Sequence, residues 1–344
     1  WDELTQQMGY WVDLDDPYIT FEPEYIESCW ALLKKLYDKG LLYKGYTIQP
    51  YSPAAGTGLS SHELNQPGTY KDVKDTTIVA QFKVVRDAVS EKLFVGGGEG
   101  ETYILAWTTT PWTLPANTGL AVGKNIQYVA IRTFNPYTYD AITVVLAKNL
   151  VGRYFASKEY SEADLALADE SNRNYEEKVA AWLLSSTNAT NREEMGWYVH
   201  GKPAAKRGLP WYQVAEFTGA DLVGIHYERL FSTEAGFPHF EGEENAFRVI
   251  PGDFVTTEDG TGIVHISPTF GADDFRVAQL NGIPALMVAD DQGKLGPIVD
   301  RTGRYVTQMG EFGGRWVKNY DGHDQSGADY KTLDESIAIR MRTN

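Results

Sequence analysis

Short runs in which apolar and polar residues alternate dominate the middle of the chain. Residues 77–84 and 126–131 carry apolar side chains at alternate positions, and residues 142–146 form a short apolar run. Alternation with a period of two predicts half-buried β-strands, and a short apolar run is consistent with a fully buried strand. From about residue 76 to residue 266 the pattern therefore predicts a β-barrel of mixed strand directions with a few helices.

A helical period precedes these strands, within residues 1–46. Pro23 and Glu24 stand where a helix would begin, because proline fits the first turn and a carboxylate is favourable near the positive end of the helix dipole. Gly40 is suited to end this helix. One apolar face recurs at steps of three and four, formed by Tyr25, Cys29, Leu32, Leu33 and Leu36. Further along, the pattern predicts a short helix at about 275–280 and a strand at 285–288.

One strand ends in a run of hydroxyl side chains. Residues 102–106 read as a strand, and the run 107–115, WTTTPWTLP, follows directly. Three adjacent strand residues cannot all face one apolar core, because successive side chains point to opposite faces. Pro111 has no N–H and pushes Thr110 toward extended geometry, so the strand should end or bulge here. Hydroxyl and backbone groups are then free to bind a polar ligand, or they close an ordinary turn.

A second apolar strand ends in a similar way. Residues 260–275 read GTGIVHISPTFGADDF, with His265 on the strand and Asp273 and Asp274 after a glycine turn. We expect this strand to run beside the threonine segment, since both motifs end at prolines after apolar strands. The ordinary structural alternatives are a buried histidine and a helix N-cap formed by one of the two aspartates.

Together the two segments closely resemble the editing domain, connective peptide 1, of class I isoleucyl-tRNA synthetases. That family has a peptide of the form W-T-T-T-P-W-T-L-P and a G-T-G-I-V-H-I-x-P-x-F-G-x-D-D segment, and both stand here without gaps. Valyl and leucyl relatives typically carry T-T-R-P in the first segment and no histidine at this place in the second. The resemblance runs along most of the chain and is weakest between about residues 148 and 195.

The resemblance implies a mixed α and β fold built on an editing β-barrel of mixed strand directions with inserted helices. We expect residues 1–70 to form a helical connector and a small ribbon, and residues 71–300 the barrel, with a helical insertion at about 160–185. Residues 301–344 would return toward a catalytic domain that this segment lacks. No H-I-G-H or K-M-S-K-S element is present, so the ATP and Mg²⁺ of aminoacylation would belong to that domain, and we expect no cofactor in this segment.

The ribbon is also expected to hold no metal. Many relatives bind zinc in a C-P-x-C-G knuckle, which corresponds here to residues 49–57, with Ser52 and Ala55 at the two cysteine positions. A hydroxyl and a methyl group cannot replace thiolates as zinc ligands. The knuckle should therefore keep its turn without zinc, and His62 nearby is expected to be a structural or surface histidine.

Charge and cysteine content limit the partners and the compartment. The formal net charge is −16, whereas a protein that grips a nucleic-acid duplex is expected to be basic. The partner that the resemblance implies is the 3′ aminoacylated end of tRNA(Ile). The negative charge agrees with this partner if only that short single-stranded end enters this segment. A single cysteine excludes an internal disulfide framework. Without a membrane span or signal peptide, we expect a soluble, cytoplasmic monomer with no membrane partner.

The implied chemistry is hydrolysis of an aminoacyl ester, in which water attacks the carbonyl that joins the amino acid to the terminal ribose. Such a site must position the ester, place the water and anchor the α-ammonium group. By the match of positions, Asp274 holds the ammonium through a charge-assisted hydrogen bond. Thr108, Thr109 and Thr110 are expected to bind the ester, the ribose and the water, so these four residues form the catalytic group. The role of Thr113 stays open.

The remaining candidates would shape the amino-acid pocket. The resemblance makes His265 a wall that admits valine and clashes with the extra methylene of isoleucine, so that it need not be a base. Trp107 and Trp112 could be apolar walls or core residues, and Trp112 is preferred for the pocket. Asp273 is included beside the site, although a structural role such as capping the helix is its first expectation.

Two other functions remain open from the residues. A valyl-type editing site that clears threonyl-tRNA would need a polar partner for the substrate hydroxyl, and an aspartate in place of His265 would have favoured it. A non-catalytic barrel that binds single-stranded nucleic acid could use the nine tryptophans and twenty-one tyrosines as stacking faces, although the negative charge opposes it. A two-carboxylate hydrolase built on Asp273 and Asp274 is disfavoured, because adjacent residues on a turn point apart.

Overall fold

The chain divides into two compact units, Trp1–Thr47 and Ile48–Asn344. The computed structural model describes residues 1–45, 47–73, 75–94, 101–135, 141–159, 209–290, 292–318 and 331–343. The helical insertion expected at about 160–185 therefore lies outside the described residues. The boundaries expected near residues 70 and 300 stay predictions.

The first unit contains two helices, α1 (Asp2–Gln7) and α2 (Pro23–Asp38). The helix predicted to begin at Pro23 is confirmed. Gly40 has a φ of +68° just after the helix, and the N–H of Leu41 donates to the carbonyl of Leu36 over 3.0 Å. This is the arrangement by which a glycine in left-handed geometry closes a helix. None of the residues of α2 is buried.

The second unit begins with a small hairpin and one short helix. Strands β1 (Tyr51–Ser52) and β2 (Thr57–Gly58) pair antiparallel. Between them the N–H of Ala55 donates to the hydroxyl of Ser52 over 3.2 Å, so a serine closes the turn locally. Helix α3 (Ser61–Leu64) follows, opened by a capping box between Ser60 and Glu63.

One nine-stranded sheet organises the rest of this unit. Its strands run in the order β10-β5-β11-β4-β7-β6-β9-β8, with β3 paired to β4. Pairs β10/β5, β11/β4, β4/β7 and β8/β9 are parallel, and the other pairs are antiparallel. Mixed strand directions were predicted and are confirmed. The strands are β3 (Ile78–Lys83), β4 (Thr102–Thr108), β5 (Gly119–Val122), β6 (Gln127–Phe134), β7 (Ala141–Ala147), β8 (Phe155–Glu159), β9 (Leu209–Thr218), β10 (Arg248–Pro251) and β11 (Ile263–Ile266).

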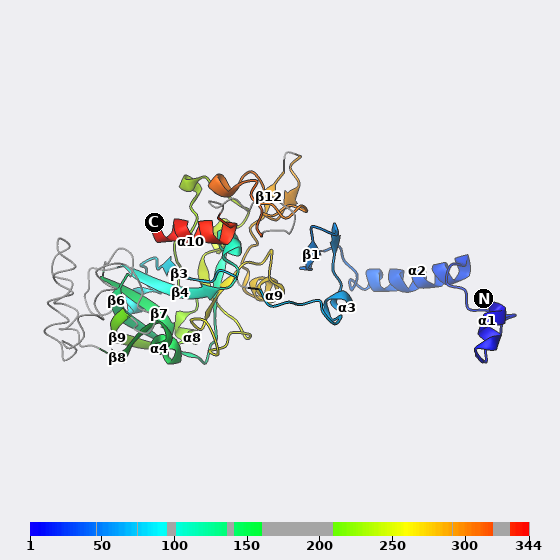
Figure 1. Ribbon diagram of the computed structural model, residues 1–344, viewed down its shortest axis with the longest axis horizontal. Helices are drawn as coiled ribbons and strands as arrows, with labels where there is room; N and C mark the ends of the chain where they lie inside the picture. Colours follow the sequence, from blue (N-terminus) through cyan, green and yellow to red (C-terminus); the bar gives the residue numbers. More distant parts are fainter. Residues whose placement is uncertain are drawn as a thin grey trace. The chain divides into compact units, whose positions relative to one another are not determined.

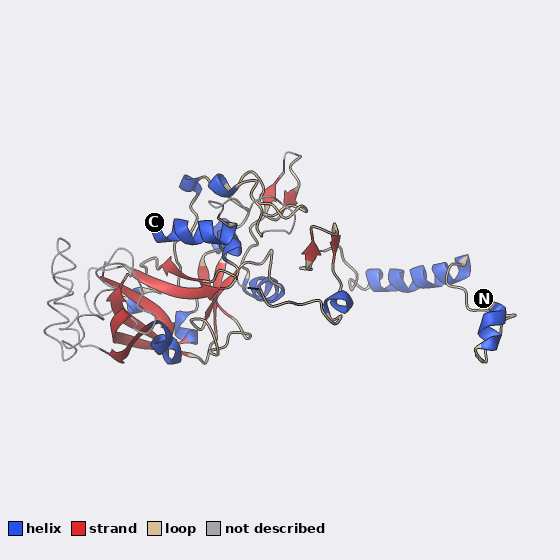
Figure 2. Ribbon diagram, viewed as in Figure 1, coloured by secondary structure: helices blue, strands red, loops and turns tan. Residues whose placement is uncertain are grey.

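The sheet is a curled half-barrel, whereas a barrel was predicted (Figure 2). Among the described strands, β10 and β8 end the sheet and do not pair with each other. Strand β4 pairs with three other strands. One edge of β4 pairs with β3 along its whole length, but the other edge pairs first with β7 and then, at Trp107, with β11.

Short helices and turns connect these strands. The helix predicted at about 275–280 is confirmed as α9, which is longer, but the strand predicted at 285–288 is reduced to the two residues of β12. In the described part, no helix combines the length and the apolar composition that crossing a membrane requires. The elements are η1 (Glu91–Leu93), η2 (Pro111–Ala116), η3 (Lys148–Leu150), α4 (Val151–Tyr154), α8 (Gly219–Leu222), η4 (Thr233–Ala235), η5 (Glu243–Asn245), α9 (Ala272–Asn281), β12 (Val288–Ala289), β13 (Leu295–Gly296), η6 (Gly310–Phe312) and α10 (Leu333–Thr343).

Both faces of the sheet are covered, and β4 shows this within three residues. Ile104 and Ala106 belong to the main core, whereas Leu105 between them belongs to a second cluster. Alternate strand residues point to opposite faces, so β4 is covered on both sides. The main core also includes Leu333 and Ile337 of α10, drawn in red in Figure 1. The C-terminal residues therefore pack into the same core as the sheet.

The turn before β11 offers a stability test. Gly262 has a φ of +74°, and a Cβ placed there would lie 2.4 Å from the Cβ of Ala147. We expect Gly262→Ala to lower the free energy of unfolding by about 2 kcal/mol or more, since strain and overpacking add. Urea denaturation measures this.

Gly152→Ala is the matched control. Gly152 lies in α4 without a positive φ, and a Cβ there would meet nothing within 4 Å. We expect this variant to be neutral or more stable by up to about 1 kcal/mol, because alanine loses less entropy in a helix. Equal effects of the two substitutions would contradict the close approach of Gly262 to β7.

Candidate functional site

The threonine segment leaves the sheet where the sequence predicted. Strand β4 ends at Thr108, and Pro111 opens the short helix η2. The N–H of Thr110 donates to the Thr108 hydroxyl over 3.0 Å, and the two hydroxyl oxygens are 3.3 Å apart. A further 3.3 Å separates the hydroxyl oxygens of Thr110 and Thr113. Three hydroxyls therefore form a continuous row at the end of β4, while Thr109 is exposed beside it.

Strand β11 brings the histidine to this row. It pairs parallel with β4, with Val264 opposite Trp107, which confirms the expectation that the two motifs run side by side. The imidazole Nε2 of His265 lies 2.8 Å from the hydroxyl oxygen of Thr113. Only 7% of His265 is exposed. The residue whose role the sequence left open, Thr113, is thus the direct link between the two motifs.

The hydrogen bonds around His265 determine its tautomer. Thr113 donates its hydroxyl hydrogen to the carbonyl of Thr110 over 2.8 Å, so its oxygen accepts from Nε2–H. On the other side, Nδ1 lies 3.3 Å from the amide nitrogen of Asn117, which is a donor only. Hence the proton is on Nε2, and both ring nitrogens have partners.

Two further contacts fix the orientation of the Asn117 amide. Its nitrogen donates to the carbonyl of Gly119 over 2.8 Å, and its oxygen accepts from the hydroxyl of Tyr227 over 2.7 Å. Since a carbonyl can only accept, the amide cannot be flipped. Burial lowers the pKa of His265 to about 4, so the ring is neutral near pH 7. A neutral ring with no free acceptor is poorly suited to act as a general base.

Asp274 lies in the first turn of α9, which follows β11 after a short loop. Its Oδ2 accepts from the N–H of Ser267 over 2.8 Å. A Cβ on Gly271 would lie 2.6 Å from the Asp274 carboxyl carbon, so a larger residue there would displace the Asp274 side chain. Burial raises the pKa of Asp274 to about 6, the Ser267 N–H opposes that rise, and the nearby charge of Asp273 adds to it.

Asp273 has a different environment. Its side chain is exposed and lies 3.7 Å from the guanidinium of Arg276, one turn along the helix. The residue at the N-cap of α9 is Gly271, and no side chain caps the helix, so the expected capping role of Asp273 is wrong. The reason is that Asp273 and Asp274 are the second and third residues of the helix, beyond the N-cap position from which a side chain caps it.

The two tryptophans lie in different elements, Trp107 in β4 and Trp112 in η2. Trp107 lies on the opposite face from Thr108 and packs over Gly260, where a Cβ would come within 3.0 Å of its ring. Trp112 is in η2, and its ring meets that of Phe270 edge-on with centroids 4.9 Å apart. Trp112 therefore joins the threonine segment to the loop that carries Asp274, whereas Trp107 does not face the hydroxyl row.

Asn117, Tyr227 and Phe270 belong to this cluster but were not predicted. Phe270 stands within the second motif and Asn117 follows the first by two residues, so their proximity to the motifs was a usable signal. Tyr227 is distant in sequence and forms no motif, and only the fold brings it to Asn117.

The cluster offers hydroxyls, a neutral imidazole and one half-buried carboxylate. Among the described residues, no group of three or more histidine, cysteine, aspartate or glutamate side chains is arranged to hold a metal ion. Such a set can anchor a cation at the carboxylate and orient a polar group along the hydroxyls. Its one hydroxyl–imidazole contact, between Thr113 and His265, has the proton on Nε2, so this nitrogen cannot accept the Thr113 proton, and the pair does not indicate covalent catalysis.

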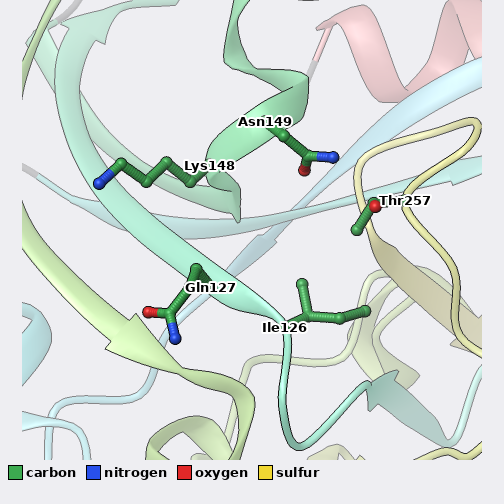
Figure 3. Close-up of a pocket in the computed structure, with 5 residues that line it drawn as sticks. All are labelled: Ile126, Gln127, Lys148, Asn149 and Thr257. Atoms are coloured by element: carbon green, nitrogen blue, oxygen red, sulfur yellow. The ribbon is translucent and has the colours of Figure 1, made fainter.

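A separate pocket of about 310 Å³ lies elsewhere, between the start of β6, η3 and the loop before β11 (Figure 3). None of the predicted site residues lines it. Its one cation, Lys148, is paired with Glu216 over 2.7 Å. The lining residues are Ile126, Gln127, Lys148, Asn149 and Thr257.

Comparison with known sequences gives consistent matches. Residues 1–247 match the family described as tRNA synthetases class I (I, L, M and V). The isoleucine–tRNA ligase of Cytophaga hutchinsonii is 50% identical over 99% of this chain, and that of Bacteroides fragilis is 48% identical over 100%. The chain spans about 27% of the length of each of these relatives.

Solved structures that resemble the chain are more distant. A structure described as the crystal structure of GlLeuRS-CP1 covers 78% of this chain and 96% of its own, with a TM-score of 0.45 and 15% identity. The editing domain of the cytosolic leucyl-tRNA synthetase of P. knowlesi covers 58% of this chain and 60% of its own, with a TM-score of 0.34 and 13% identity.

The raised pKa of Asp274 leads to a pH-dependent prediction. Its usual value of 3.8 rises to about 6 in the folded chain, so the folded state binds the proton more tightly than the unfolded state. Below about pH 4 both states are protonated, and stability is lost as the pH rises through 6. Asp274→Asn keeps an oxygen for the Ser267 N–H and cannot ionise. We expect it to be more stable than wild type by up to about 3 kcal/mol at pH 7.

Urea denaturation at several pH values measures this difference. The gain of Asp274→Asn over wild type should be near zero at pH 4 and should grow to its full size by pH 7. Asp273→Asn, at an exposed position, should show only a small gain. A constant difference between Asp274→Asn and wild type across this range would contradict the burial of an ionisable carboxylate.

Proposed function

This chain belongs to the class I tRNA synthetase family, and from that premise we propose that it carries the editing site of an isoleucine–tRNA ligase. The reaction is hydrolysis of the ester in valyl-tRNA(Ile). The observation that carries the proposal is the 2.8 Å contact between Thr113 and His265, by which two motifs far apart in the chain form one polar cluster. The activity proposed is that of this segment, since the relatives are much longer.

The proposed reaction needs neither a metal nor a covalent intermediate. The oxygen of a water molecule bonds to the ester carbonyl carbon, the bond from that carbon to the ribose oxygen breaks, and that oxygen receives a proton. Valine and free tRNA result. Thr108, Thr109 and Thr110 orient the ester, the ribose and the water through hydroxyl and backbone groups. The row of hydroxyls at the end of β4 supports this role.

Asp274 is proposed to anchor the α-ammonium group of the amino acid. With a pKa of about 6 the carboxylate is mostly ionised near pH 7, and it is half-buried, so a charge-assisted hydrogen bond to an ammonium would be strong. Oδ2 accepts the Ser267 N–H, and the carboxylate also interacts with the Asp274 backbone N–H, so these two groups hold the carboxylate in place for the ligand. Trp112, through Phe270, brings this loop to the threonines.

His265 is proposed to exclude isoleucine by its bulk. The ring is neutral, and both nitrogens are bonded to protein groups, which favours a fixed wall over a base. Such a wall is useful because one methylene changes binding by only about 1–3 kcal/mol, a general magnitude for which the isoleucine–valine pair is itself the usual example. A second site that is too small for the correct amino acid reverses the bias.

The proposed partner is the 3′ aminoacylated end of tRNA(Ile), bound by a monomer. The net charge of −16 fits a site that receives only a short single strand. In this proposal residues 1–70 supply a helical connector and a knuckle ribbon without zinc, and ATP and Mg²⁺ act outside this segment.

Removing the ammonium anchor tests the proposal directly. We expect Asp274→Ala to reduce hydrolysis of valyl-tRNA(Ile) by about 100-fold or more, because a half-buried charge pair with the substrate is lost. Deacylation of radiolabelled valyl-tRNA with enzyme in excess measures this. Asp273→Ala is the control, since its carboxylate is exposed, and it should retain most of the activity. The opposite ranking of the two variants would show that the roles are wrongly assigned.

Shortening the histidine tests specificity. We expect His265→Ala to hydrolyse isoleucyl-tRNA(Ile) as well as valyl-tRNA(Ile), because the enlarged pocket admits the extra methylene while Asp274 and the threonines remain. Both esters are assayed side by side. If His265 is instead the general base, both rates should fall together by roughly 10²–10⁴-fold.

The rival functions give different results in the same assay. Wild-type chain that clears threonyl esters but not valyl esters would indicate a valyl-type site. Wild-type chain that binds aminoacyl-tRNA without releasing any amino acid would indicate a pure nucleic-acid-binding domain.

A further inference from the structure

The peptide groups of Trp112 are held from both sides by residues near the C-terminus. The Trp112 N–H donates to Oδ1 of Asp334 over 2.8 Å, across 222 positions of sequence. The Trp112 carbonyl accepts from the hydroxyl of Tyr305, across 193 positions. Neither contact follows from the motif that contains Trp112, and neither residue has a role in the reaction proposed above.

Both holding groups are buried, so they are costly unless they are paired. Asp334 is 2% exposed and Tyr305 is 1% exposed. A buried carboxylate must be compensated, and here Lys318 pairs with Asp334 while also contacting Asp75 over 2.6 Å. The Tyr305 ring lies in the main core. The two groups therefore have little freedom to move away from Trp112.

Trp112 lies between the hydroxyl-bearing residues of the site. In sequence it lies between Thr110 and Thr113, whose hydroxyl groups contact each other. The Thr113 hydroxyl also contacts His265. Its ring meets Phe270, next to the loop that carries Asp274. A fixed Trp112 backbone therefore holds two features in place: the row of threonine hydroxyls and the contact of the Trp112 ring with Phe270.

We propose that Asp334 and Tyr305 are positioning residues for the editing reaction, acting through the Trp112 backbone on the threonine row. This inference rests on the proposed function for its reaction. It adds residues of the C-terminal segment that no sequence motif assigns to the site. Their effect is on geometry: a displacement of about 1 Å of groups that orient a reacting ester can cost about 100-fold in rate.

Tyr305→Phe is the first test, because it keeps the buried ring and removes only the hydroxyl. Hydrolysis of valyl-tRNA(Ile) is followed in single turnovers at several enzyme concentrations. We expect the rate constant at saturation to fall about 10-fold or more, with the half-saturating concentration unchanged. Glu311→Gln is the matched control, since it removes the 3.0 Å ion pair of Glu311 to Arg340 in α10 and does not contact Trp112. It should react at the wild-type rate.

Asp334 is tested by a pair of variants. Asp334→Asn keeps an oxygen that can accept from the Trp112 N–H, whereas Asp334→Leu does not. We expect the asparagine variant to retain clearly more of the saturating rate constant than the leucine variant. Thermal unfolding of each variant confirms that it is folded at the assay temperature, and Tyr305→Phe decides the question if Asp334→Leu does not fold.

A purely structural role predicts something else. If Tyr305→Phe melts at a lower temperature but hydrolyses at a rate within about two-fold of wild type, the proposal is wrong. It is also wrong if the loss lies entirely in the half-saturating concentration, or if the two Asp334 variants are equally active.

Failure of the proposed function is recognised separately. If wild-type chain hydrolyses no aminoacyl-tRNA, the function is wrong, and deuterium exchange of a peptide spanning residues 108–116 still tests the positioning. Tyr305→Phe should then speed exchange in this peptide, while Glu311→Gln should not. Unchanged exchange in Tyr305→Phe would overturn the positioning role.

Discussion

The parallel pairing of β11 with the end of β4 is the constraint on which the candidate site depends. β4 pairs with β3 along one edge, and its other edge is shared between β7 and β11. The side chain of His265, on β11, reaches the hydroxyl of Thr113, 152 positions away in sequence. A one-residue shift of β11 would turn His265 to the opposite face, because side chains alternate along a strand. The register thus decides whether the two motifs meet.

Burial acts in opposite directions on the two ionisable groups of this cluster. It removes the charge of His265, whose pKa falls to about 4, and both nitrogens of the neutral ring contact protein groups. It raises the pKa of Asp274 to about 6, so an ionised Asp274 near neutral pH destabilises the fold. That cost agrees with the proposed role of Asp274 as the anchor of a cationic group, since such a carboxylate must stay ionisable.

The C-terminal segment shows how the rest of the unit supports this small cluster. Leu333 and Ile337 pack α10 into the main core, and the same helix presents Asp334 to the Trp112 N–H. Tyr305 reaches the carbonyl of the same residue. The packed core therefore holds the two groups that bond the Trp112 backbone, next to the threonine row.

Local pattern determined much of this protein: the helix from Pro23, the strands predicted at 77–84 and 126–131, the strand end at Pro111, and the proximity of two motifs that both end at prolines. Tertiary structure alone decided the rest. The sheet is a half-barrel because its two end strands, β10 and β8, do not pair with each other among the described strands. Trp107 faces away from the hydroxyl row because of the pleat, and neither aspartate caps α9 because the helix begins earlier than expected. Tyr227, Tyr305 and Asp334 act through single long-range hydrogen bonds, which leave no periodicity or spacing in a sequence.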